Sequence, residues 1–120
     1  LSNMTPGAAE HILGGERTVF FHKQLVDVWP LDELWPIFAS LNEPSYLKID
    51  CDGGEIGVLD GATKSLRNDK LRGIIMEMDL EEEEHIVGLL RAAGLKQTDR
   101  YDHRDDKLIG RICYGRFERD

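Results

Sequence analysis

The sequence predicts an α/β fold, in which strands and helices alternate along the chain. The main observation lies at residues 46–62, where apolar spacing changes from that of a strand to that of a helix across Gly53 and Gly54. A nearly continuous apolar run at 73–78 is typical of a parallel strand that is buried on both faces. An amphipathic helical pattern follows that run, as expected of a chain built from strand–turn–helix units.

Composition indicates one globular domain and argues against several kinds of partner. The chain has 120 residues, of which 41% are hydrophobic, and this suits a folded domain of its length. The formal net charge of −8 argues against nucleic acid as a partner, because phosphate backbones attract clustered Lys and Arg. No apolar run reaches the length of a membrane span, no signal-peptide pattern is present, and two cysteines imply no disulfide framework. We therefore expect a cytoplasmic protein without a membrane partner.

The first part of the chain is the least patterned. Residues 1–15 predict a loop or a frayed start, which leaves an α/β core at 16–120. Residues 17–28 are rich in strand-forming types and predict at least one strand.

A short helix is expected to begin near Asp32. Pro36 disfavours helical geometry in the residue before it, so this helix should end at Trp35 or restart at residues 37–39.

The central unit consists of a strand at 46–49, a tight turn and a helix. Such a turn usually needs a positive φ, which Gly53 or Gly54 can adopt without steric cost. The apolar face of the helix is formed by Ile56, Leu59, Ala62 and Leu66. Gly57 and Gly61 lie one helical turn apart and predict close packing against the sheet or another helix.

Glu77 interrupts the apolar run at 73–78. A buried carboxylate must find a partner or remain protonated. If this strand neighbours the one at 46–49, Lys48 is a candidate partner in a buried ion pair. A role of Glu77 in a functional site is the alternative, and the sequence leaves both open.

The last part of the chain predicts a helix and two strands. Asp79 and the acidic residues at 81–84 suit a helix start, where the dipole favours negative charge. Gly94 predicts that the helix ends in a Schellman motif. Its apolar stripe consists of Ile86, Leu89, Leu90 and Ala93. Residues 96–101 and 108–117 then predict an antiparallel hairpin at the edge of the sheet.

The candidate catalytic residues are the three acids that follow the central strand: Asp50, Asp52 and Glu55. Ligands of α/β sheets bind beyond the carboxyl ends of the strands, which is where these side chains fall. The alternative is structural, with the aspartates ending the strand and Glu55 serving the first turn of the helix.

Other site patterns fit less well. In a calcium loop that begins at Asp50, the sixth position would be glycine, but Glu55 stands there. The Cys and His spacings fit no zinc site, so no metal is expected. The run Asp50-x-Asp52-Gly53 resembles that of haloacid-dehalogenase-type phosphatases, although Gly54 replaces their usual threonine. A DxD-type phosphatase therefore stays an alternative.

A stronger resemblance covers most of the chain. Residues 47–62, LKIDCDGGEIGVLDGA, are similar to the signature KID-x-(E/D)-G-x-E-x-x-V-L-x-G-A of the FkbM family of S-adenosylmethionine-dependent methyltransferases. Residues 31–34 and 74–77 are similar to an upstream LD-x-L segment and a downstream strand of that family. Cys51 and Gly54 depart from its common valine and alanine.

The resemblance implies a Rossmann-like class I methyltransferase sheet, of which this chain supplies the later strands with an antiparallel C-terminal hairpin. It implies one partial methyltransferase domain over residues 1–120, acting with S-adenosylmethionine on the hydroxyl of a sugar or natural product. It assigns catalysis first to Asp50 and then to Asp52 or Glu55. The residues that it places as substrate or structural support are Lys48, Gly53 and Glu77.

The usual cofactor motif of that class is not recognisable here. No strand followed by Gly-x-Gly precedes residue 46, so the cofactor-binding residues are unknown and the glycine-rich half is expected to be absent from this chain. A non-catalytic α/β interaction module, or a remnant, is therefore the alternative function. A half sheet also exposes a strand edge and an apolar face, which predicts self-association.

Overall fold

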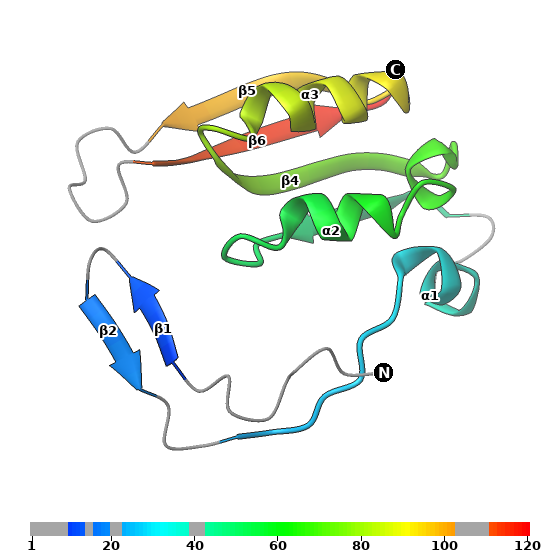
Figure 1. The fold of residues 1–120 in the computed structure, drawn as a ribbon. Helices are drawn as coiled ribbons and strands as arrows, with labels where there is room; N and C mark the ends of the chain where they lie inside the picture. Colours follow the sequence, from blue (N-terminus) through cyan, green and yellow to red (C-terminus); the bar gives the residue numbers. More distant parts are fainter. Residues whose placement is uncertain (1–9, 14–15, 20–22, 39–42, 103–110) are drawn as a thin grey trace.

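The computed structural model describes residues 10–13, 16–19, 23–38, 43–102 and 111–120. Its main part is an open four-stranded sheet with the strand order β3-β4-β6-β5 (Figure 1). The strands are β3 (Ser45–Ile49), β4 (Leu71–Asp79), β5 (Lys96–Asp102) and β6 (Ile112–Glu118). β3 and β4 are parallel, whereas β6 is antiparallel to both of its neighbours. The α/β class is confirmed, and the predicted hairpin has β5 at the edge and β6 inside the sheet.

Helices cover one face of this sheet. α2 (Glu55–Asp60) and α3 (Glu83–Ala92) lie on that face (Figure 1). The core between the helices and the sheet includes Leu59, Ile74, Met76, Met78, Ile86, Leu90, Cys113 and Phe117. On the opposite face, Ile75 is 44% exposed. The prediction that β4 is buried on both faces is therefore wrong at Ile75, because α2 and α3 cover only one side.

The N-terminal part contains a hairpin that we did not predict. β1 (Glu10–Leu13) pairs antiparallel with β2 (Glu16–Val19) in a sheet of their own. The predicted loop is therefore wrong over residues 10–13, whereas β2 confirms a strand within residues 17–28. The missed signal is the Gly14-Gly15 pair between two short runs, which is a typical hairpin dipeptide.

α1 (Leu31–Phe38) continues through Pro36, so the predicted break before this proline is wrong. A proline inside a helix costs roughly 3 kcal/mol, so other contacts must hold α1 together. The Asp32 carboxylate accepts hydrogen bonds from the backbone N–H groups of Lys64 (3.0 Å) and Ser65 (2.7 Å). Two side chains of α1, Leu31 and Trp35, also pack against the core. Contacts made after the chain folds thus outweigh the local preference.

The two glycines of the central helix region differ in their surroundings. A Cβ atom at Gly61 would lie 3.2 Å from Cβ of Pro30, so close packing is confirmed there, against the residue before α1. A Cβ atom at Gly57 would meet nothing within 4 Å, so the predicted packing is wrong at this position. The 3₁₀ helix η1 (Ser65–Arg67) follows α2. Of the predicted apolar face, Leu59, Ala62 and Leu66 are buried, whereas Ile56 is half-buried against the core.

The end of α3 and the end of β6 are held together by Arg119. Gly94 has a φ of +90° and its N–H bonds the carbonyl of Arg91, which confirms the predicted Schellman motif. The Arg119 guanidinium donates to the carbonyl oxygens of Leu66, Leu71 (2.9 Å) and Ala93 (2.8 Å). One side chain therefore ties η1, β4 and α3 together.

None of the described helices is long and apolar enough to cross a membrane.

Gly57→Ala is expected to raise the free energy of unfolding by roughly 0.5–1 kcal/mol, because alanine favours the helix and its methyl group meets open space. Gly61→Ala is the matched control, since its methyl group would press on Pro30 and offset that gain. Urea unfolding of the two variants measures the difference. An equal gain at both positions would contradict the contact assigned to Gly61.

Candidate active site

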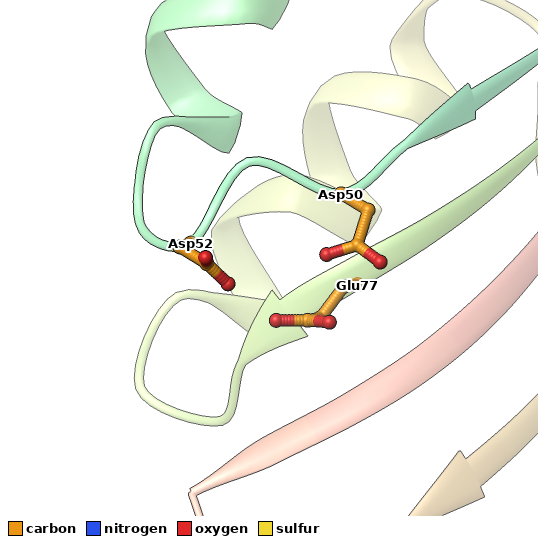
Figure 2. Close-up of side chains that lie close together, drawn as sticks. All are labelled: Asp50, Asp52 and Glu77. Atoms are coloured by element: carbon orange, nitrogen blue, oxygen red, sulfur yellow. The ribbon is translucent and has the colours of Figure 1, made fainter.

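Three carboxylates meet at the carboxyl edge of β3 and β4 (Figure 2). Asp50 and Asp52 lie in the loop after β3, and Glu77 lies near the end of β4. One oxygen of each lies within 4.8 Å of the others. Because the two strands are parallel, their carboxyl ends coincide, and this brings residues that are far apart in the sequence together.

The turn that carries the aspartates is shaped by its backbone. Asp52 has a φ of +50° and Gly53 a φ of +103°, so the predicted positive φ is confirmed at Gly53. The buried Glu55 carboxylate accepts hydrogen bonds from the backbone N–H groups of Cys51 (3.2 Å) and Gly53 (3.0 Å). Glu55 is thus turned toward the loop backbone and is not grouped with the other acids, whereas Gly53 supports the turn that presents them.

Glu77 is the buried member of the cluster, with 8% of its surface exposed. The Tyr114 hydroxyl, on β6, donates a hydrogen bond of 2.8 Å to Glu77 Oε2. The predicted ion pair with Lys48 is wrong, since no ion pair joins these side chains. In the strand register Lys48 lies beside Ile75, two residues before Glu77, which places it about 7 Å back along the sheet.

The surroundings of Glu77 favour its protonated form. Burial raises the pKa of Glu77, and a hydrogen bond with Asp50 and the charges of both aspartates raise it further, whereas the hydrogen bond from Tyr114 opposes them. The same Tyr114–Glu77 bond raises the pKa of Tyr114 to about 12, so the phenol keeps its proton at neutral pH. Burial and the two aspartates therefore act on Glu77 in the same direction, toward the protonated form.

This arrangement supports proton transfer. An exposed carboxylate next to a buried carboxyl group with a raised pKa can accept a proton from a bound hydroxyl. Carboxylate oxygens are also the ligand type that magnesium and calcium prefer, but exposed acids often gather without an ion. The expectation that no metal binds stays a prediction.

Tyr114 is the site residue that the sequence analysis missed. Its place opposite Glu77 follows from the antiparallel register of β4 with β6. The alternating pattern of residues 112–117 shows which residues share a face, but no local signal gives their register against a strand about forty residues earlier.

Glu77→Gln is expected to flatten part of the pH dependence of stability. Because the folded-state pKa is raised above its ordinary value of 4.5, the folded protein holds this proton more tightly, and stability falls as pH rises through the folded pKa. The glutamine variant has no carboxyl group to titrate and should lack this loss of stability. Denaturant unfolding between about pH 4 and pH 9 measures the free energy of unfolding of both proteins.

Tyr114→Phe provides the second arm of this test. It removes the hydrogen bond that lowers the pKa of Glu77, so the loss of stability should move to higher pH. Carbon-13 NMR of the Glu77 carboxyl group follows the same titration directly. An unchanged titration in Tyr114→Phe would contradict the role assigned to this bond.

Comparison with known proteins gives the family of the chain. The model of the methyltransferase FkbM domain matches residues 2–97, a range that includes β3, β4 and all three acids of the cluster. No curated protein and no solved structure matches the chain. The family match covers well over half of the sequence and confirms the resemblance based on residues 47–62. The chain belongs to the FkbM family of methyltransferases.

Proposed function

We propose that this chain is an S-adenosylmethionine-dependent O-methyltransferase that acts on a hydroxyl group of a sugar or natural product. Membership of the FkbM methyltransferase family supports the reaction class. The observation that supports a hydroxyl group as the methyl acceptor is the position of the exposed Asp50 carboxylate. It lies beside the buried Glu77, at the carboxyl edge of two parallel strands.

The chemistry assigned to these residues is general base catalysis. In O-methylation the hydroxyl oxygen forms a bond to the methyl carbon while the carbon–sulfur bond of the donor breaks and a thioether leaves, and the hydroxyl loses its proton. Asp50 accepts that proton, because its carboxylate is exposed and one of its oxygens lies within 4.8 Å of the buried Glu77 carboxyl group. Glu77, fixed by Tyr114, holds Asp50 in place, and Asp52 is the alternative base.

The cofactor side is incomplete in the described residues. S-adenosylmethionine supplies an electrophilic methyl group when bound. The described residues before β3 form an antiparallel hairpin and α1, and they contain no strand that leads into a Gly-x-Gly turn. These residues do not fit the cofactor, so the proposed chemistry is confined to the acceptor. We propose that β3 and β4 correspond to the fourth and fifth strands of a Rossmann-like sheet whose cofactor-binding strands lie outside the described residues.

Asp50→Asn is expected to lower kcat for transfer of a labelled methyl group by about 10²–10⁴-fold, because the acceptor hydroxyl loses its base. The KM for S-adenosylmethionine should change little. The assay uses the protein as the cell produces it, with a small-molecule extract as the source of acceptors. Asp60→Asn, at the exposed end of α2, is the matched control and should keep full activity.

Two results would overturn this assignment. Full activity of Asp50→Asn would remove Asp50 from the reaction. Absence of both methyl transfer and calorimetric binding of S-adenosylmethionine would favour the alternative of a non-catalytic interaction module.

The grouping of Asp50 and Asp52 with Glu77 is also the observation that favours the phosphatase alternative, since such enzymes hold magnesium with acids of this kind. Family membership and Gly54, where those enzymes usually carry threonine, argue against it. Magnesium-dependent turnover of a generic phosphomonoester is therefore expected to be undetectable. Turnover that Asp50→Asn abolishes would reverse the ranking.

A further inference from the structure

The face of the sheet opposite α2 and α3 carries a hollow of about 420 Å³. Side chains of three neighbouring strands line it, and those that share the exposed face are Tyr46, Lys48, Gly73, Ile75, Arg116 and Glu118. A Cβ atom at Gly73 would lie 3.1 Å from the Tyr46 ring and 3.2 Å from the carbonyl oxygen of Phe117. Glycine at this position therefore leaves room for the Tyr46 ring to lie against β4.

The strand register orders this face in rows that run across the sheet. Lys48, Ile75 and Arg116 form one row, with a cation on each side of an isoleucine. The next row toward the carboxyl edge of β4 pairs Glu77 with Tyr114 and includes the acid cluster. The two rows are two residues apart along β4, which is about 7 Å.

The first row places two cations on one face of the sheet, in a chain with a net charge of −8. Within the described part of the chain, neither Lys48 nor Arg116 forms an ion pair. Asp99 lies opposite Arg116 on β5, but its Oδ1 accepts the backbone N–H of Arg100 (2.8 Å). Glu118 lines the far end of the hollow, in the row beyond Arg116 and away from the acid cluster.

The two cationic side chains lie on strands separated by β4, about 10 Å apart at the backbone. Both are long enough to reach an anion placed above Ile75. A carboxylate or a phosphate group suits this position, because Arg binds such groups in a bidentate manner and Lys adds a second charge.

We propose that this hollow binds the anionic group of the methyl acceptor, a carboxylate or a phosphate, between Lys48 and Arg116. The acceptor is then a small hydroxylated anion whose reacting hydroxyl lies about 7 Å from its charged group, at Asp50. The role of this hollow as an acceptor site rests on the methyltransferase function proposed above. The binding of an anion in the hollow does not depend on that function.

The test compares three probes that share one ring: glucose, glucuronate and glucose 6-phosphate. NMR titration of the nitrogen-15-labelled chain is expected to show saturable shifts at the amides of Lys48, Ile75 and Arg116 with a charged probe and none with glucose. The stronger of the two charged probes identifies the anion as carboxylate or phosphate. High salt should weaken the binding, because both cations are exposed.

Variants then assign the effect to the two cations. Lys48→Met and Arg116→Gln are each expected to weaken binding of the charged probe by about two- to fivefold, the upper part of the range for one exposed charge pair. Lys64→Met and Arg91→Gln remove exposed cations away from the hollow and should leave binding unchanged. Arg116→Lys keeps the charge but loses the bidentate geometry, so it should bind more tightly than Arg116→Gln and less tightly than the unmodified chain, which separates a charge effect from a folding defect.

Equal binding of glucose and both charged probes, or an equal loss in the control variants, would overturn the anion site. Methyl transfer provides a separate readout. If transfer occurs but Lys48→Met and Arg116→Gln leave the acceptor KM unchanged, the site is wrong while the proposed function stands. If both variants weaken anion binding but no transfer occurs, the site stands and the proposed function is wrong.

Discussion

The parallel pairing of β3 with β4 is the contact on which the candidate site depends. Its register places Ile49 beside Met76, so that Asp50 emerges next to Glu77. A shift of the pairing register of β4 by one residue would turn the Glu77 side chain into the apolar core and Met76 or Met78 toward solvent. The burial of the methionines under α2 and α3 therefore also fixes the acid cluster on the opposite side of β4. Packing of one face of the strand determines the chemistry of the other.

The opposite end of β4 is held by a different interaction. There the Arg119 guanidinium bonds three backbone carbonyls, and burial together with the nearby Arg72 lowers its pKa. These carbonyls belong to segments that no regular hydrogen-bond ladder connects, so the arginine supplies donors where the helix and strand ends lack them. With Arg119 at one end of β4 and Tyr114 near the other, β6 fixes both ends of the strand that carries Glu77.

The features that the sequence predicted correctly are those with a local physical cause. The change of apolar spacing after Ile49, the positive φ of Gly53 and the Schellman motif at Gly94 all depend on residues close together in the chain. Asp50 and Asp52 directly follow a strand, and this local pattern predicts their place at the carboxyl edge of the sheet. The contact of Tyr114 with Glu77 and the clamp of Arg119 join residues more than twenty-five positions apart, and no periodic pattern encodes them. Pro36 is the converse case, because a strong local preference gave the wrong answer once Asp32 and Trp35 found partners elsewhere.

The place of β6 in the sheet has a consequence for how the protein is made. β6 follows β5 along the chain, yet it lies between β4 and β5 and pairs with both. During translation, β4 and β5 therefore leave the ribosome before the strand that must separate them. Until β6 follows, each has an open edge and an apolar face, and a direct pairing of β4 with β5 would be a trap. The sheet therefore becomes complete only when β6 inserts between them.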